Sequence, residues 1–252
     1  MPATILTAKG RELRDALEIV SSAVSRDHSR PMLTAINLRP VRDHSELVRV
    51  AATDSYRLHV ATIRATHELP EEGVSIAELK PTMIPAKRAY VDHSIVREGE
   101  HVSIGDKNGA RVVEGAFPNV EQLRPGWWDA PPFGLSFVPS DELYAFCKLA
   151  ERATSNDRNY VAMRGEVDDD ANMTLTQPTP FGDLSLVVRC EMRGEQPERW
   201  GMRPGYFADA CAAIGGRIEI RGTGPQRPFL FCSAGSTSPL APWALVMPIR
   251  LA

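Results

Sequence analysis

The tripeptide Asp-His-Ser occurs three times, as Asp27-His28-Ser29, Asp43-His44-Ser45 and Asp92-His93-Ser94. These are the residue types of a hydrolytic triad, in which a histidine takes the serine proton and an aspartate orients the histidine. A fold assembles a triad from separated positions, and the sequence has no Gly-x-Ser-x-Gly turn to present a nucleophilic serine. We therefore interpret the repeats as coincidence, and we keep a small hydrolase that uses one of these histidines only as an alternative.

Metal-binding side chains are the next candidates. The run Asp168-Asp169-Asp170 could attract Mg²⁺, but it lies between two expected strands, where a solvated acidic turn is ordinary. Zinc sites and redox dithiols need closely spaced cysteines, and no Cys-x-x-Cys pair is present. We expect buried free thiols at Cys147, Cys190, Cys211 and Cys232. The sequence thus predicts no metal, no cofactor and no enzymatic activity.

The composition is that of a globular protein. A chain of 252 residues, 43% of them hydrophobic, can bury one large core or two ordinary ones. Its 29 basic and 32 acidic residues give a net charge of −3, whereas a tight nucleic-acid binder usually carries a basic patch or a high pI. No signal peptide opens the chain and no apolar run is long enough to cross a membrane, so we expect a cytoplasmic protein without a membrane partner.

The order of expected elements repeats between the two halves of the chain. Each half begins with a strand, at residues 3–7 and 135–138, followed by an amphipathic helix. The first helix, residues 11–24, carries Leu13, Leu17, Val20 and Val24 on one face. The second starts at an N-cap, Ser140 or Asp141, and carries Leu143, Phe146, Cys147 and Ala150. Three strands then follow in each half, at residues 34–41, 46–52 and 57–63, and at residues 160–167, 173–177 and 184–190.

A second unit completes each half. In the first half we expect a short helix at residues 87–93 and only two strands, near Val102 and Val112. In the second half we expect a helix at residues 206–214 and strands at 217–221, 229–232 and 243–247. The predicted fold class is α+β, with two tandem domains that each place two helices against antiparallel sheets. The expected boundaries are 1–125 and 133–252, joined by a linker at 126–132 that is rich in proline and tryptophan.

The last residues of the chain are unusually apolar. The run Val246-Met247-Pro248-Ile249-Arg250-Leu251 contains one cation, and Pro248 has no N–H to give to a sheet. One interpretation is an edge strand that finishes the core. The other, which we favour, is a strand that leaves its sheet at Met247 and forms one wall of an apolar groove.

Three separated stretches carry a family resemblance. They are Ala52-Thr53-Asp54-Ser55-Tyr56-Arg57-Leu58, the terminal run Met247-Pro248-Ile249-Arg250-Leu251, and Val113-Glu114-Gly115-Ala116-Phe117-Pro118 followed by Leu123-Arg124-Pro125. Together they resemble the bacterial DNA polymerase III beta subunit, the sliding clamp family. The resemblance implies a non-catalytic processivity factor, a ring around double-stranded DNA that holds its cations inward. It also implies one groove between two domains, where peptides of DNA polymerases and clamp loaders dock.

The resemblance also implies which residues form the groove. Leu58, Pro125, Val246, Met247, Pro248 and Ile249 would line it, with Thr53, Ser55, Tyr56, Arg57 and Arg250 at its rim. Ser55 and Tyr56 stand where the family usually has glycine and histidine, so partner preference is expected to differ. An interpretation without a groove makes the apolar residues core and Arg57 part of a surface ion pair.

Assembly and DNA contact follow from the same resemblance. The family's usual chain has three domains, and this chain matches the second and third, so closure of a six-domain ring would need a homotrimer. The edge left by the missing third strand of the first half could serve that assembly or prevent it. A clamp-like peptide-binding regulator that does not encircle DNA is the main alternative. The expected DNA-facing cations, which would bind without reading sequence, are Arg11, Arg26, Arg30, Lys148, Arg152 and Arg158.

Overall fold

The computed structural model describes residues 1–123, 126, 128, 131–154 and 162–251. The chain divides into two compact units: Met1–Leu123 with Ser238–Pro242, and Arg124–Thr237 with Trp243–Ala252. The proposed groove residue Pro125, the proposed DNA-facing Arg158, the start of the strand expected at residue 160 and part of the expected linker lie outside the described residues.

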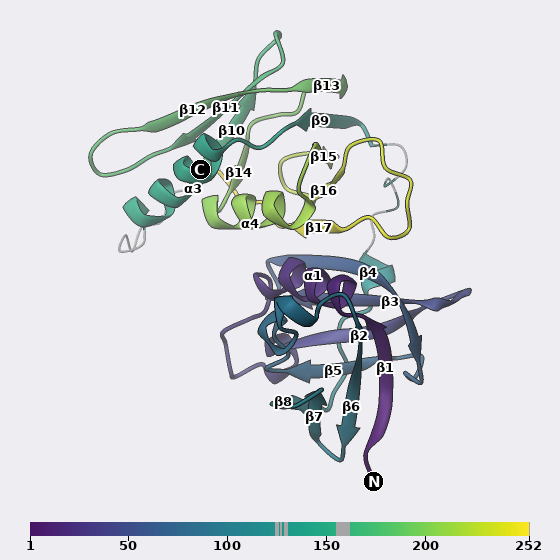
Figure 1. The fold of residues 1–252 in the computed structure, drawn as a ribbon. Coiled ribbons are helices and arrows are strands. Elements are labelled where there is room, and N and C mark those ends of the chain that lie inside the picture. The colour runs from purple at the N-terminus through teal and green to yellow at the C-terminus, as the bar shows by residue number, and fades with distance from the viewer. Residues whose placement is uncertain (124–125, 127, 129–130, 155–161, 252) are drawn as a thin grey trace. The chain divides into compact units, whose positions relative to one another are not determined.

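The first unit contains one full-length helix among its strands (Figure 1). Its elements are β1 (Ala3–Lys9), α1 (Gly10–Ser21), the 3₁₀ helix η1 (Pro31–Thr34), β2 (Ala35–Val41), β3 (His44–Thr53), β4 (Arg57–His67), β5 (Val74–Ala77), the 3₁₀ helices η2 (Pro81–Met83) and η3 (Ala86–Arg88), β6 (Asp92–Glu98), β7 (His101–Ile104), β8 (Lys107–Val112) and the short α2 (Val120–Leu123).

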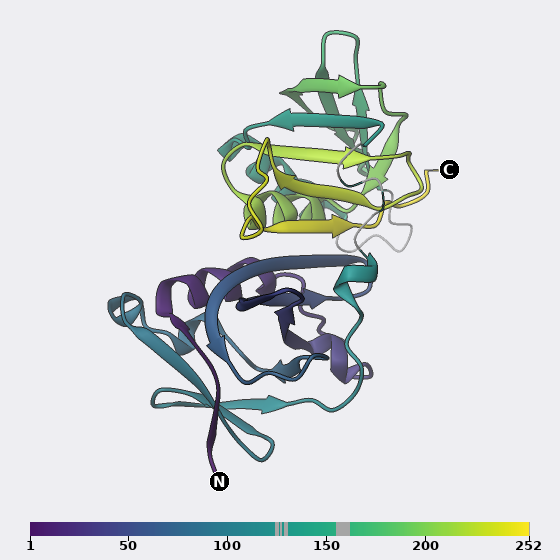
Figure 2. The same ribbon diagram turned by 90° about the vertical axis from the view of Figure 1, so that its right-hand side faces the viewer.

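Antiparallel pairing joins all eight strands of this unit into a closed circuit. The order is β1-β6-β7-β8-β5-β2-β3-β4, and β4 returns to β1 through the pairs Leu6–His67 and Ala8–Ala65. Figure 2 shows these strands curving around the interior of the unit. Helix α1 packs on β3 and β4, because Leu13, Leu17 and Val20 on its inner face are completely buried. The helical spacing that predicted this face is therefore confirmed.

The prediction of a helix at residues 87–93 is wrong. The chain forms only the single turn η3 there and then enters strand β6 at Asp92. Pro85 precedes the turn, and Ile95 is the only fully buried residue of β6, so the segment lacks the apolar stripe that would hold a longer helix on the core.

The expectation of only two strands in this region is also wrong. Strand β6 is the third, and it pairs with β1 on one side and β7 on the other. Its register with β1 runs from Ala3–Arg97 to Lys9–Asp92, so it covers the whole of the first strand. The unusual open edge inferred from a missing strand therefore does not exist.

The second unit repeats the strand–helix–strands order (Figure 1). Its elements are β9 (Phe133–Phe137), α3 (Asp141–Thr154), β10 (Met163–Val167), β11 (Asn172–Gln177), β12 (Leu184–Arg189), β13 (Glu191–Gly194), β14 (Trp200–Met202), α4 (Pro204–Ile214), β15 (Ile218–Gly222), β16 (Phe229–Ser233) and β17 (Trp243–Val246). The α+β fold with antiparallel sheets is confirmed. Strands β5, β13 and β14, which have only three or four residues each, were not expected from the sequence.

Two strand arrays enclose the core of the second unit. One has the order β17-β16-β15-β9-β13 and the other β12-β11-β10-β14. Helices α3 and α4 pack on each other, and aromatic side chains fill the interior, with Phe207 stacked on Trp200 at a ring distance of 6.0 Å. Ser140 Oγ accepts a hydrogen bond from the Leu143 N–H at 3.2 Å, which confirms the expected N-cap of α3.

All four cysteines are buried free thiols, as expected. Desolvation raises the pKa of Cys147 to about 12 and that of Cys190 to about 11, so neither is an activated nucleophile. Trp128 packs edge-on against Trp243 at 5.1 Å, and its carbonyl accepts a hydrogen bond from Arg221. This tryptophan thus fixes part of the expected linker to the second unit.

Candidate functional site

The tip between β3 and β4, residues 54–56, is a compact turn built by its own polar groups. Asp54 Oδ1 accepts the N–H groups of Tyr56 and Arg57 at 2.9 and 3.0 Å. Thr53 Oγ1 donates to the Arg57 carbonyl at 2.6 Å and accepts the Ser55 N–H at 3.1 Å. Ser55 adopts a left-handed conformation with φ of 80°. The turn therefore exposes Ser55 and Tyr56 while it keeps its own backbone groups bonded.

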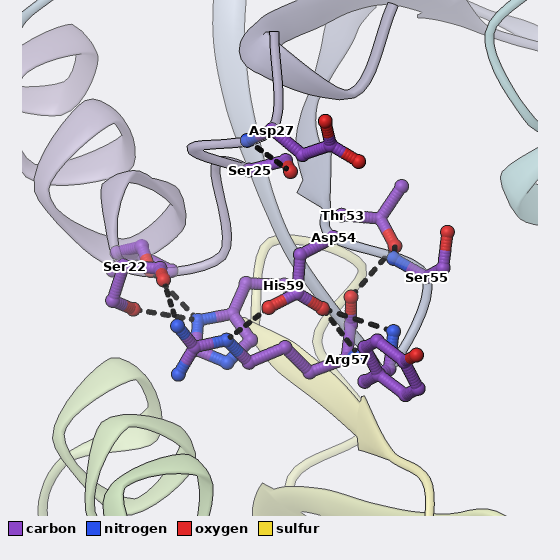
Figure 3. A network of polar contacts seen from close by, with 10 residues as sticks. Ser22, Ser25, Asp27, Thr53, Asp54, Ser55, Arg57 and His59 are labelled. Atoms are coloured by element: carbon purple, nitrogen blue, oxygen red, sulfur yellow. Dashed lines mark hydrogen bonds and ion pairs between the residues drawn. The ribbon is translucent and has the colours of Figure 1, made fainter. Parts of the chain in front are cut away.

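Arg57 lies inward rather than on the surface (Figure 3). Its Nε is 3.3 Å from Asp54 Oδ2, and the exposed side-chain fractions of the two are 11% and 14%. Its Nη2 donates to the carbonyl of Ser22, just beyond the end of α1. A cation at a helix C-terminus interacts favourably with the carbonyl dipoles, so Arg57 fastens the turn to α1. The interpretation of Arg57 as part of a surface ion pair was right that its partner is an acidic residue, but the two side chains are largely buried.

A buried histidine completes this network. His59 is fully buried in β4, and its Nδ1 is 3.2 Å from Ser22 Oγ and 3.1 Å from the Ile19 carbonyl oxygen. A carbonyl can only accept, so Nδ1 carries the hydrogen. The C-terminal turn of α1 is thus held by two side chains of β4, as Figure 3 shows. Sequence analysis did not identify this role of His59, although its alternation with Arg57 along the strand was a usable signal.

The loop after α1 is joined to the same tip. Asp27 accepts hydrogen bonds from the Ser29 backbone N–H and side chain, and this bonding, led by the side-chain contact, lowers the Asp27 pKa. Arg30 forms an ion pair with Asp27 at 2.9 Å and donates to Ser55 Oγ at 3.0 Å. Arg30, expected at a DNA-facing surface, and Ser55, expected at the groove rim, are therefore in direct contact.

The C-terminal run leaves its sheet where the sequence predicted. Strand β17 ends at Val246, and Met247 after it is 42% exposed. Pro248 and Ile249 are half-buried, and the Ile249 N–H donates to the carbonyl of Gly201 in β14 at 2.8 Å. The run is therefore held extended on the second unit by one backbone bond, with apolar side chains partly open to water.

The expected site residues form two groups of different exposure. Thr53, Leu58 and Val246 are buried, whereas Tyr56 is 58% exposed and Met247 is 42% exposed. Ser55 and Arg250 are also exposed, and Arg57 is intermediate. Tyr56 is therefore open to a ligand on the first unit and Met247 on the second, while Leu58 and Val246 are buried in their own strands.

Most of the expected DNA-facing cations are on the surface. Arg11, Arg26, Arg30, Lys148 and Arg152 are exposed. Arg11 is 3.7 Å from Asp15 on the next turn of α1, and Arg14 pairs with Glu18 at 2.9 Å, so the outer face of α1 carries both signs of charge. Exposed pairs of this kind contribute little to stability and leave the cations available to other anions.

The first and third Asp-His-Ser tripeptides serve local structure. In the first, Asp27 bonds Ser29 directly and not through His28. In the third, His93 Nε2 lies 2.9 Å from the Arg88 carbonyl, and Ser94 Oγ lies 2.8 Å from Thr7 Oγ1. Residues 168–170 form a turn in which Asp168 accepts the N–H groups of Asp170 and Asn172. These contacts match the interpretation of the repeats as coincidence and of the acidic run as a turn.

Nowhere in 1–123, 126, 128, 131–154 and 162–251 do three or more His, Cys, Asp or Glu side chains gather closely enough to hold a metal ion. No helix within those ranges is long and apolar enough to cross a membrane.

Residues 7–119 match the family model described as the DNA polymerase III beta subunit, central domain. The chain is 25% identical to the beta sliding clamp of Bacillus subtilis over 250 residues, and 26% identical to that of Staphylococcus aureus over 252 residues. Each alignment covers 94% of this chain and 62% of the relative, so the chain spans less than two thirds of the length of these relatives.

Solved structures show the same fold. The DNA polymerase III beta subunit of Pseudomonas aeruginosa superposes with a TM-score of 0.78 at 17% identity, over 99% of this chain and 68% of that one. The C. crescentus beta sliding clamp gives 0.78 at 20% identity, over 99% and 66%. The resemblance to the DNA polymerase III beta subunits, the bacterial sliding clamps, is thus confirmed: residues 7–119 match the model of their central domain, and the chain is similar to these proteins in sequence and in fold.

Proposed function

We propose that the protein is a DNA sliding clamp. In this function it encircles duplex DNA without reading its sequence and tethers a DNA polymerase and its loader through short peptides. It makes and breaks no bond, and enclosure together with peptide docking holds the polymerase on its template. Residues 133–252 would act as the counterpart of the family's C-terminal domain and residues 1–125 as that of the middle domain. Such a protein works in the cytoplasm.

The observation that carries the proposal is the geometry of the C-terminal run. An apolar segment that is half exposed, extended and fixed by the Ile249–Gly201 backbone bond offers a preformed surface to a peptide. Met247 suits such a surface, because an unbranched thioether side chain adapts to different partners. Tyr56 provides an exposed aromatic ring on a turn that is already ordered, so little conformational entropy is lost on binding.

The peptide site is tested with a fluorescently labelled clamp-binding peptide from a bacterial replicative polymerase. Met247→Ala combined with Leu58→Ala should weaken binding by about 2 kcal/mol or more, because few residues carry most of the energy of such an interface. Met247→Ala alone removes an exposed side chain and leaves the core intact. A loss of affinity in this single variant would therefore come from the lost contact with the peptide and not from unfolding. Leu58→Ala is accepted only if its thermal midpoint shows that the protein remains folded.

The matched control is Val138→Ala, which removes another exposed apolar side chain, 63% accessible, from the loop before α3. This variant should bind the peptide as the original does. Unchanged affinity in both Met247 variants would place the docking site elsewhere, and equal losses in all variants would indicate non-specific adhesion.

Assembly is proposed as a homotrimer, in which three chains of two units close a six-unit ring. Among the described strands, β12 ends its array, and β5 pairs with β8 only at Val112 and Arg111. Asp183 precedes β12 and Arg189 ends it, while Asp106 precedes β8 and Arg111 lies near its end. Antiparallel pairing, between chains, of β12 with the part of β8 that β5 does not pair with would bring opposite charges together at both ends.

Light scattering after size exclusion tests the assembly. We expect a mass three times the 27.7 kDa of the chain. Val187, exposed at 61% on β12, should be sensitive to charge, so Val187→Asp is expected to lower the mass. A stable monomer at micromolar concentration that still binds the peptide would instead support the regulator that does not encircle DNA.

The exposed cations supply the proposed contact with DNA. Arg11, Arg26, Arg30, Lys148 and Arg152, with Arg158, would face phosphate groups and release counterions. Binding to DNA should therefore weaken as salt rises, and it should weaken less steeply in variants that keep fewer of these cations. A ring held by enclosure should still slide off linear DNA. Retention that is equal on linear and circular DNA would contradict enclosure.

A further inference from the structure

The turn that replaces the expected second helix of the first unit exposes an aromatic ring between cations. Tyr90, two residues after the end of η3, is 82% exposed, and Val91 beside it is 44% exposed. Lys87 and Arg88 form the last turn of η3 and are both on the surface. The Tyr90 ring is not part of the core, so it is available to a partner from outside the unit, with cations on both elements beside it.

Backbone bonds hold this turn rigidly against the start of α1. The Gly10 N–H donates to the Val91 carbonyl at 2.9 Å, and the N–H of Val91 donates to the Arg88 carbonyl at 3.2 Å. His93 Nε2 lies 2.9 Å from the same Arg88 carbonyl. A Cβ at Gly10 would stand 2.5 Å from the His93 ring and 2.9 Å from the Val91 oxygen, so only glycine allows this approach. The ring of Tyr90 is therefore presented by an ordered backbone.

The same approach gathers cations from two elements. Lys9 and Arg11 flank Gly10 at the N-terminus of α1, and Lys87 and Arg88 lie on the turn that contacts Gly10. Lys9, Lys87 and Arg88 form no ion pair within the described residues. The nearby acids are Asp92, which is opposite Lys9 in the strand register, Glu12 in the first turn of α1, and Asp15, which is 3.7 Å from Arg11. Cations therefore exceed acids in this cluster by four to three.

We propose that Lys9, Arg11, Lys87, Arg88 and Tyr90 form a binding site for single-stranded nucleic acid. The cations would contact successive phosphates, and the Tyr90 ring would stack on one unpaired base. Charge alone would not distinguish strands, because duplexes carry the denser phosphate charge. The exposed ring makes the distinction, since bases in a duplex already stack on each other and offer no free face. This inference rests on the proposed clamp function for its setting, because a clamp at a primer end meets unpaired template.

Fluorescence anisotropy of the full chain tests the site, with labelled oligothymidylate of about 20 nucleotides and a blunt duplex of equal length as the two probes. Tyr90→Ala should weaken oligothymidylate binding about tenfold and leave duplex binding unchanged. Tyr90→Phe keeps the ring and should restore single-strand affinity. Lys87→Ala with Arg88→Ala should weaken both probes and make the salt dependence shallower. Phe181→Ala, which removes an exposed ring from the turn between β11 and β12, is the matched control and should have no effect.

Three results would overturn the inference: equal single-strand affinity with and without the Tyr90 ring, equal losses on both probes in Tyr90→Ala, or no binding of oligothymidylate by the unaltered protein. Particle mass and polymerase-peptide affinity are measured on the same variants. If the particle forms no ring and binds no peptide while the Tyr90 effect persists, the clamp proposal fails and the single-strand site stands. If ring and peptide binding are intact and Tyr90→Ala has no effect, the single-strand site alone fails.

Discussion

Arg30 Nη1 donates to Ser55 Oγ at 3.0 Å, so the loop after α1 and the tip between β3 and β4 are bonded to each other. The first of these residues is proposed to face DNA and the second to lie at the rim of the peptide groove. Arg30 also pairs with Asp27, whose low pKa keeps it charged at neutral pH. A phosphate that drew Arg30 away would release Ser55, which gives the two proposed surfaces a physical connection.

Two substitutions of Ser55 distinguish the energy of the Arg30 hydrogen bond from the backbone strain at this position. Ser55→Ala and Ser55→Gly both lose the Arg30 contact, but only glycine adopts a φ of 80° without steric cost. We expect Ser55→Gly to have a higher free energy of unfolding than Ser55→Ala by about 1 kcal/mol, as measured with urea. Equal stability of the two variants would mean that the left-handed conformation is not under strain.

Arg57 is expected to stabilise the first unit through Asp54 and the Ser22 carbonyl. Arg57→Ala leaves a half-buried carboxylate and a helix end without their guanidinium, so the free energy of unfolding should fall by about 2 kcal/mol. The control is Arg42→Ala, because the Arg42–Glu71 pair is 3.8 Å long and both side chains are more than four fifths exposed. The free energies of unfolding of both variants are measured by chemical denaturation. A decrease of similar size in Arg42→Ala would contradict the stabilising role assigned to Arg57.

Glu219 is expected to make the stability of the second unit depend on pH. Its carboxylate is 1% exposed; burial alone would raise its pKa, but hydrogen bonds from Arg221 and Arg193 outweigh this effect and the pKa is lowered. A carboxyl group with a lowered pKa in the folded state contributes stability above its unfolded pKa, about 4.3, and loses that contribution as the pH falls through the folded value. Glu219→Gln should therefore cost about 3 kcal/mol at pH 7 and progressively less below about pH 4.

Denaturation series at several pH values test this expectation. Glu191→Gln is the matched control, because Glu191 pairs with Arg217 at 2.5 Å on the protein surface and its carboxylate is 76% exposed. Its effect should be small at every pH. A stability difference between the Glu219 variant and the original protein that stays constant with pH would show that shape, not charge, is what Glu219 contributes.

Gly165 is expected to tolerate no side chain. A Cβ there would overlap the six-membered ring of Trp200, which is buried between β10 and the aromatic core. Overpacking of this kind forces a shift of backbone or ring, so Gly165→Ala should lower the free energy of unfolding by about 3 kcal/mol. Gly126→Ala, where no atom lies within 4 Å of a Cβ, should leave the thermal midpoint unchanged.

Periodicity was sufficient for the elements that bury a regular stripe. Leu13, Leu17 and Val20 predicted α1, and Leu143, Phe146 and Cys147 predicted α3, because a packed helix needs apolar residues every three or four positions. Strand β6 was missed because its burial is irregular, with Ile95 as its one fully buried residue. Strands β5, β13 and β14 are too short to show alternation.

The candidate site was only partly predictable for a similar reason. The family resemblance placed Tyr56 at the rim of the predicted groove and Met247 in its lining, and both side chains are exposed. The inward direction of Arg57 depends on Ser22, which is 35 positions away in the chain, and the contact of Arg30 with Ser55 depends on a separation of 25. No local pattern encodes such pairings, because they arise only when β4 packs under α1.

The closed strand circuit of the first unit also constrains how the protein is made. Thr7 in β1 bonds Ser94 in β6, 87 positions later, so the opening strand has no second neighbour until most of the unit has left the ribosome. Contacts of such long range slow folding and leave apolar strands uncovered meanwhile. A fragment that ends after β4 would contain only β1 to β4, and both edge strands of this sheet, β1 and β2, would lack their outer partners. Expression of such a fragment is therefore expected to yield insoluble material.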